Sequence, residues 1–141
     1  MIREARAGDA PELAALTTEL GYPSTADDVV RRLPFLLDRD DQRLLVAAGD
    51  NDCAVGWIHV VLRRSLQNDP YVEILGLVVS ERARGGGIGA QLVAEGERWA
   101  REQGVPLVRV RSNIVRERTH RFYVNLGYEL KKTSHTFVKR L

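Results

Sequence analysis

The sequence has very little cysteine, few aromatic residues and no long apolar run. Its single cysteine, Cys53, excludes an internal disulfide framework and a zinc site built from several cysteines. Aromatic residues make up 6% of the 141 residues, and apolar runs such as Ile74–Val79 are far too short to cross a bilayer. No apolar signal segment follows Met1. We therefore expect a cytoplasmic protein with no metal site and no membrane contact.

An excess of charge of one sign is also absent from the chain as a whole. The formal net charge is +2, from 21 basic and 19 acidic side chains, which is too balanced to indicate nucleic-acid binding. The two halves differ, however. Residues 1–80 hold 8 basic and 13 acidic side chains, whereas residues 81–141 hold 13 basic and 6 acidic ones. The second half therefore suits an anionic ligand better than the first.

The length predicts one domain over residues 1–141, and the pattern of apolar residues and turns predicts its elements. Strands are predicted at Met1–Arg6, Arg43–Ala48, Ala54–Leu62, Tyr71–Val79, Leu107–Arg111, Tyr128–Lys131 and Thr136–Arg140. Helices are predicted from Asp9 to Gly21, from Ser24 or Thr25 to Pro34, over Ile88–Gln103 and over Glu117–Leu126. This order predicts an α/β (α+β) domain whose mixed, mainly antiparallel central sheet is flanked by about four helices. Gly76, inside a strand, predicts a β-bulge or a close backbone approach.

A glycine-rich loop lies between the fourth predicted strand and the third predicted helix. Its sequence is Arg84-Gly85-Gly86-Gly87-Ile88-Gly89. Glycines let the backbone approach a ligand, and the first N–H groups of a helix favour anions, so the loop predicts a phosphate or pyrophosphate site. A Walker A loop is excluded because Gly89 is not followed by Lys and Ser or Thr. The dinucleotide pattern Gly85, Gly87, Ala90 leaves an NADP-binding protein as an alternative, although the spacing from the strand fits it poorly.

Two segments resemble motifs of the GNAT superfamily of N-acetyltransferases. Residues 77–89 are similar to its acetyl-CoA-binding motif, in which Arg84, Gly87 and Gly89 match the pattern Gln/Arg-x-x-Gly-x-Gly/Ala. Asn113 and residues 119–128 resemble a second motif of the family at the family's spacing. The order of elements is also similar from end to end. The resemblance implies a GNAT-like fold and a direct transfer of acetyl from acetyl-CoA to a primary amine, without an acyl-enzyme.

The resemblance also implies roles for particular residues. The strand before the loop would lie along the pantetheine arm, and a backbone N–H near Leu77 or Val78 would stabilise the oxyanion. Tyr123 would protonate the departing thiolate. The implied acetyl-CoA-binding residues are Leu77, Val78, Val79, Arg84, Gly85, Gly86, Gly87, Ile88, Gly89 and Asn113.

Two residues are candidates for the general base that deprotonates the amine. Glu73 is an acid inside an otherwise apolar strand, and family members often carry Glu at the matching position. Strand alternation predicts that it shares a face with Leu75, Leu77 and Val79. His59 is the competitor, because antiparallel pairing of the two strands would bring it about one residue pair from Glu73.

The acceptor is specified least by the sequence. The resemblance implies that the first two helices and the loop before the Glu73 strand line the acceptor pocket. In this sequence that region includes Tyr22, Phe35, Trp57 and Arg64–Pro70. The acids of this half favour a cationic small-molecule amine. The main alternative to an enzyme is a non-catalytic acyl-CoA-binding module. A homodimer is common in such folds, but nothing in the sequence fixes the oligomeric state.

Overall fold

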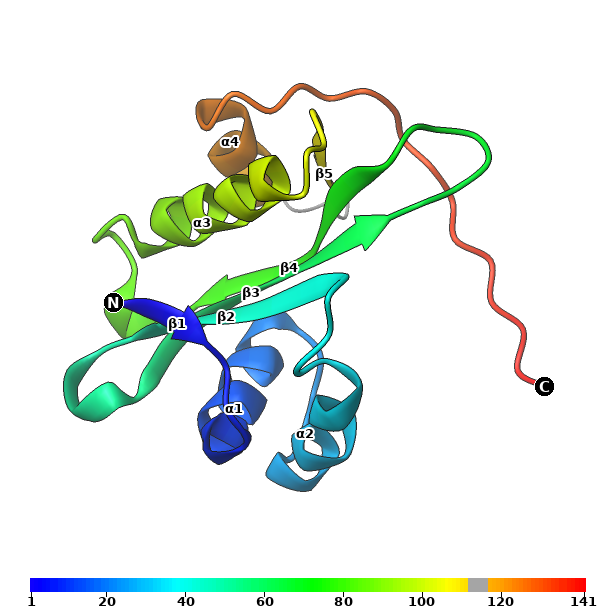
Figure 1. Ribbon diagram of the computed structural model, residues 1–141. Helices are drawn as coiled ribbons and strands as arrows, with labels where there is room; N and C mark the ends of the chain where they lie inside the picture. Colours follow the sequence, from blue (N-terminus) through cyan, green and yellow to red (C-terminus); the bar gives the residue numbers. More distant parts are fainter. Residues whose placement is uncertain (112–116) are drawn as a thin grey trace. The chain divides into compact units, whose positions relative to one another are not determined.

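The computed structural model describes residues 1–111 and 117–141, which divide into two units, Met1–Val110 and Arg111–Leu141. The first unit is built on a five-stranded sheet (Figure 1). Its strands are β1 (Ile2–Glu4), β2 (Gln42–Ala48), β3 (Ala54–Arg63), β4 (Tyr71–Val79) and β5 (Val108–Val110), and they lie side by side in chain order. Strands β1 to β4 pair antiparallel, whereas β5 pairs parallel to β4. The sheet is therefore mixed and mainly antiparallel, as predicted.

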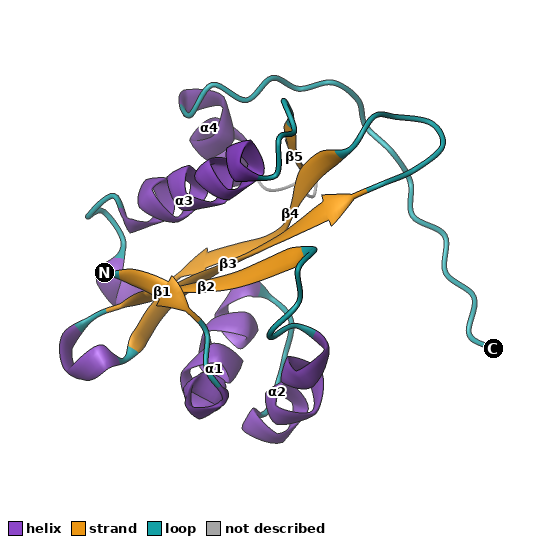
Figure 2. Ribbon diagram, viewed as in Figure 1, coloured by secondary structure: helices purple, strands orange, loops and turns teal. Residues whose placement is uncertain are grey.

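Helices cover both faces of this sheet. Figure 2 shows α1 (Ala10–Leu20) and α2 (Ala26–Arg32) on one face and α3 (Ile88–Glu102) on the other. Helix α1 ends where Gly21 adopts a left-handed φ of 110°, and α2 begins with a capping box between Thr25 and Asp28. These local signals appear in the sequence, which is why the helix limits were predictable.

The core consists of two apolar layers, one on each side of the sheet. Ile58 and Val60 on β3 are fully buried, and Gly96 of α3 approaches both of them closely. On the opposite face, Leu13 and Leu16 of α1 belong to a buried cluster that also contains Val46 and Val78. Burial of these side chains holds β3 and β4, the strands beside the glycine loop, at the centre of the unit.

The second unit contains α4 (Glu117–Asn125) and the C-terminal segment. Tyr123 of α4 is buried and packs edge-to-face against Phe122 and Tyr128, at centroid distances of 5.1 and 5.5 Å. Gly127, with a φ of 91°, ends the helix, and the N–H of Tyr128 bonds to the carbonyl of Tyr123 at 3.0 Å.

The two strands predicted at Tyr128–Lys131 and Thr136–Arg140 are not formed. Residues 128–141 carry no helix or strand, and Leu130, Phe137 and Val138 are each at least 86% exposed. The prediction was wrong because short alternating segments are stable as strands only when a neighbouring strand supplies backbone partners and an apolar face is buried.

Candidate active site

A bulge in β4 shapes the middle of the sheet. His59 pairs with Gly76 but the next residue, Val60, pairs with Ile74, so Leu75 is left without a partner on β3. A Cβ on Gly76 would lie 2.6 Å from the ring of Trp57, so this position needs glycine. The bulge predicted from Gly76 is confirmed, and the group that approaches this glycine closely is the side chain of Trp57.

The bulge changes which β4 side chains share a face. Glu73 pairs with Val61, whereas Leu77 pairs with Ile58 and Val79 with Gly56. Directly paired residues project to the same side, and Val61 and Ile58 lie on opposite sides because they are three positions apart on β3. The prediction that Glu73 shares a face with Leu77 and Val79 is therefore wrong: one extra residue reverses the alternation.

Beyond the bulge, one edge of β4 lacks a neighbouring strand. Strand β5 pairs with Val72, Glu73 and Ile74 only, and no other described strand pairs with this edge over Leu75–Val79. The segment thus exposes a stretch of strand edge whose backbone groups can pair with an extended ligand. Leu77, Val78 and Val79, along which the family resemblance implies the pantetheine arm, lie in this stretch.

The glycine loop follows directly from this edge. Gly85 and Gly87 have φ values of 88° and 80°, and a Cβ on either would meet no atom within 4 Å. Gly87 precedes α3, and its carbonyl accepts the N–H of Gln91 at 3.0 Å. The N–H groups of Ile88, Gly89 and Ala90 come before this first helical bond, so they are available to an anion at the start of α3.

Arg84 links the loop to the strand. Its Nε donates to the carbonyl of Val79 at 3.0 Å, and the N–H of Ser80 bonds to the carbonyl of Val55 at 2.8 Å. The first turn of α3 carries no acidic residue that would oppose an anion. Strand edge, loop and helix start are therefore continuous at the place where the sequence predicts an anion site, Arg84–Gly89.

Glu73 is a buried carboxylate, 5% exposed, on the α1 and α2 side of β4. The guanidinium of Arg63 donates to Glu73 Oε2 from Nη2 at 3.0 Å and from Nε at 3.3 Å. Arg109 is in register with Glu73 on β5, and its guanidinium lies 4.4 Å over the ring of Tyr71. The carboxylate charge is thus compensated by Arg63 on the neighbouring strand β3.

His59 lies two ladder pairs from Glu73 instead of the one predicted, because Glu73 pairs with Val61, two residues along β3. Its Nε2 lies 2.7 Å from Gln42 Oε1. Burial of the ring, and secondarily the charge of Arg63, lowers the pKa of His59 below its ordinary value of 6.5. His59 is therefore neutral at neutral pH, which is compatible with a base as well as with a structural residue.

The remaining predicted catalytic and cofactor residues lie in the second half of the chain. Tyr123 is 7% exposed, and burial raises the pKa of its phenol to about 12. It belongs to the second unit, whereas Glu73 and the glycine loop belong to the first. Asn113 lies outside the described residues.

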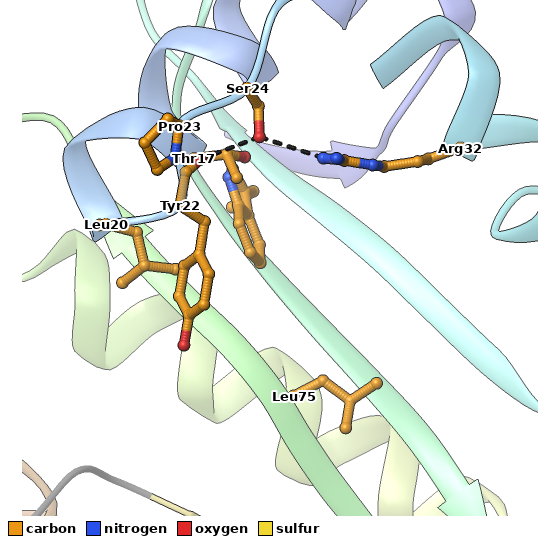
Figure 3. Close-up of a pocket in the computed structure, with 9 residues that line it drawn as sticks. Thr17, Leu20, Tyr22, Pro23, Ser24, Arg32 and Leu75 are labelled. Atoms are coloured by element: carbon orange, nitrogen blue, oxygen red, sulfur yellow. Dashed lines mark hydrogen bonds between the residues drawn. The ribbon is translucent and has the colours of Figure 1, made fainter. Parts of the chain in front are cut away.

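An open pocket of about 530 Å³ lies beside the bulge (Figure 3). It is lined by Thr17, Leu20, Gly21, Tyr22, Pro23, Ser24, Arg32, Trp57 and Leu75. Two predicted pocket residues, Tyr22 and Trp57, are among these, but Phe35 and Arg64–Pro70 are not. Arg32 was missed because only the packing of α2 beside the end of α1 brings it to the pocket.

Comparison with known proteins gives a family assignment. Residues 10–128 match the Acetyltransferase (GNAT) family. The chain belongs to this family. An aminoalkylphosphonate N-acetyltransferase of Salmonella typhimurium is 35% identical over 128 residues, which cover 89% of this chain and 78% of that protein. An aminoglycoside N(6′)-acetyltransferase of Serratia marcescens is 25% identical over 118 residues, or 81% of each chain.

The structural comparison agrees with this GNAT assignment. An aminoglycoside N-acetyltransferase solved in complex with CoA shares the fold, with a TM-score of 0.86 at 20% identity and coverage of 100% of this chain and 95% of that one. The predicted fold class is thus confirmed, and the chain is an acyltransferase of the N-acetyltransferase type. The GNAT family uses acetyl-CoA as the acetyl donor. In the described part of the chain, no group of three or more His, Cys, Asp or Glu residues could hold a metal, and no helix could cross a membrane.

Proposed function

We propose that this GNAT protein transfers the acetyl group of acetyl-CoA to the primary amine of a small molecule by direct attack. The observation that carries the proposal is the continuous site formed by the open edge of β4, the glycine loop and the start of α3. The amine nitrogen attacks the thioester carbonyl, loses one proton, and expels CoA, which leaves as the thiol after taking up one proton.

The chain's own backbone supplies most of the donor site in this proposal. The amides of Gly85–Gly89 bind the pyrophosphate with help from Arg84, because loop N–H groups and a helix start both favour anions. Leu77, Val78 and Val79 lie along the pantetheine arm, and Asn113 contacts it. The N–H of Leu77 or Val78 donates to the developing oxyanion.

Glu73 is the proposed general base. Its side chain lies on the face of β4 that also carries the pocket beside Trp57 and the bulge. Arg63 pairs with the buried side chain of Glu73, whose carboxyl oxygen is the atom that accepts the proton of the amine in this proposal. His59, on the same face and neutral, is the alternative base.

Tyr123 is the proposed general acid. A pKa of about 12 means that the phenol is protonated throughout the physiological pH range, as an acid that protonates a thiolate must be. Tyr123→Phe keeps the packing against Phe122 and Tyr128 and removes only the hydroxyl. We expect this variant to lower kcat more than it changes KM.

The charge of the acceptor is a finer prediction. The acids of the first half favour a cationic amine, and the Serratia relative acts on an aminoglycoside. Arg32, in contrast, favours an amine that also bears an anion, and the Salmonella relative acts on an aminoalkylphosphonate. The cytoplasmic location, the homodimer and the single domain over residues 1–141 stay predictions.

Ligand-induced stabilisation and turnover test this proposal together. CoA and acetyl-CoA should raise the melting temperature, and NAD and NADP should not, because only ligands that bind the native state stabilise it. CoA release should then depend on an added amine. Stabilisation by acetyl-CoA without CoA release across a broad amine panel would instead favour the non-catalytic acyl-CoA-binding module, and protection by NADP alone would favour the NADP alternative. The exposed thiol of Cys53 adds a constant background to a thiol assay, which an enzyme blank removes.

A further inference from the structure

The pocket beside the bulge carries a positive charge. Of the nine described residues that line it, Arg32 is the one with a formal charge. Its neighbour on α2, Arg31, donates to Asp28 Oδ1 at 2.9 Å, whereas Arg32 has no carboxylate within 4.0 Å in the described part of the chain. No ion pair within the described residues therefore neutralises the charge of Arg32.

The structure holds Arg32 in place through Ser24. Arg32 Nη1 donates to Ser24 Oγ at 3.0 Å, and that hydroxyl donates to the carbonyl of Tyr22 at 2.9 Å (Figure 3). The N–H of Ser24 donates to Thr18 Oγ1 at 3.0 Å, which ties the segment to α1. A guanidinium has five N–H donors in a planar fork, so this single bond leaves most of the fork for a ligand.

The nearby acids do not neutralise this site. Asp28 accepts the N–H of Thr25 and the guanidinium of Arg31, and both interactions belong to the opening turns of α2. The first half is acidic in total, yet its carboxylates do not line the pocket. The local charge at the pocket is therefore opposite to the charge of the half that contains it.

We propose that the amine acceptor carries an anionic group, a phosphonate or carboxylate, that Arg32 and Ser24 bind while the amine lies at the β4 bulge. This inference rests on the proposed acetyl transfer. Tyr22, Trp57 and Leu75 supply apolar walls for the carbon chain between the two ends of such an acceptor. Arg32 is thus a specificity residue, and it binds the end of the acceptor that does not react.

Kinetics with matched acceptors test the inference. We expect 2-aminoethylphosphonate and β-alanine to have at least tenfold higher kcat/KM than ethanolamine or 1,3-diaminopropane. Arg32→Gln should lower kcat/KM for the two anionic acceptors by about 10- to 100-fold, mainly through KM, because hydrogen bonds to charged groups have this magnitude. The same variant should change the ethanolamine value by about twofold or less. Arg31→Gln is the matched control on the same helix turn and should leave all four values nearly unchanged.

Two results would overturn the inference while leaving acetyl transfer intact: a preference for the diamine, or an anionic-acceptor KM that Arg32→Gln does not raise. If no amine supports CoA release, acetyl transfer itself fails, and a binding measurement decides the role of Arg32. A rise in melting temperature with 2-aminoethylphosphonate that Arg32→Gln abolishes would support the anion site. The absence of that rise in the unmodified protein would refute it. Comparing 2-aminoethylphosphonate with β-alanine distinguishes a phosphonate from a carboxylate.

Discussion

The pair of Glu73 and Arg63 is asymmetric. The side chain of Glu73 is 6% exposed, whereas that of Arg63 is 47% exposed, so its guanidinium can form hydrogen bonds with water. Removing Arg63 would leave a buried carboxylate without this partner, but neutralising Glu73 leaves a half-exposed cation that solvent can stabilise. The glutamate is therefore the member of the pair that can be neutralised with little structural cost.

We predict that Glu73→Gln lowers kcat/KM by about 10²- to 10⁴-fold, the range expected when a general base is lost. The amide oxygen can still accept from Arg63, so the melting temperature should change little. Initial rates of CoA release and thermal melts measure the two effects. His59→Gln, the control at the competing base, should retain most of the rate. A reversed outcome, with the rate lost in His59→Gln and kept in Glu73→Gln, would make His59 the base.

We predict a second effect of His59, on stability. Its folded pKa is lowered by burial, so below about pH 6.5 the unfolded chain takes up a proton that the folded chain does not. The contribution of neutral His59 to the free energy of unfolding is therefore fully present above pH 6.5. It is lost as the pH decreases toward the lowered pKa, by up to about 1.4 kcal/mol per pH unit.

Urea unfolding at pH 7.5, 6.5 and 5.5 checks this effect. The unmodified protein should lose more unfolding free energy on acidification than His59→Gln does. His135→Gln, at an exposed position in the C-terminal segment, should follow the unmodified protein. If the free energy of unfolding changes equally with pH in all three proteins, the pKa of His59 is the same in the folded and unfolded states.

Among the elements, the loop before α3 and the loop after it provide a natural comparison. Gly87 and Gly104 both have left-handed φ values, 80° and 75°, and a Cβ on either would meet no atom within 4 Å. They stand at opposite ends of α3, but only Gly87 lies at the proposed anion site. The same substitution at the two positions therefore separates backbone strain from ligand binding.

We predict that Gly87→Ala and Gly104→Ala each lower the free energy of unfolding by about 1 kcal/mol, because a side chain disfavours the left-handed region. Only Gly87→Ala should also weaken CoA binding, because Gly87 directly precedes the helix start proposed to bind the phosphates. Chemical denaturation gives the first quantity, and calorimetric titration with CoA gives the second. Equal losses of CoA affinity in both variants would refute an anion site at the start of α3.

The elements also show what the sequence could and could not predict. The end of α1 at Gly21, the start of α2 at Thr25 and the bulge at Gly76 were predictable, because each depends on local backbone geometry. The face of Glu73 was not, since one unpaired residue reverses the strand alternation and the sequence does not say which residue that is. Arg32 lines the pocket only because α1 and α2 pack side by side, which no local pattern encodes.

At the scale of the whole molecule, the uneven charge of the chain predicts that salt weakens the binding of an anionic cofactor. Residues 81–141 carry an excess of seven basic side chains, and the loop at Arg84–Gly89 lies near the start of this segment. CoA is a polyanion, so attraction by this half should add to the contacts of the loop amides. Salt at 0.5 M screens exposed charges over a few ångströms, whereas hydrogen bonds from loop amides are less sensitive to it.

We predict that the Kd for CoA rises severalfold between 50 and 500 mM NaCl, and that the Kd for dephospho-CoA, which has fewer negative charges, rises less. Calorimetric titrations of both ligands across this salt range measure how steeply each Kd rises with salt concentration. A larger rise in Na₂SO₄ than in NaCl at equal ionic strength would show competition by the anion in addition to screening. Equal slopes for the two ligands would mean that the 3′-phosphate lies outside the field of the basic half. The attraction would then act on the pyrophosphate alone, through Arg84 and the start of α3.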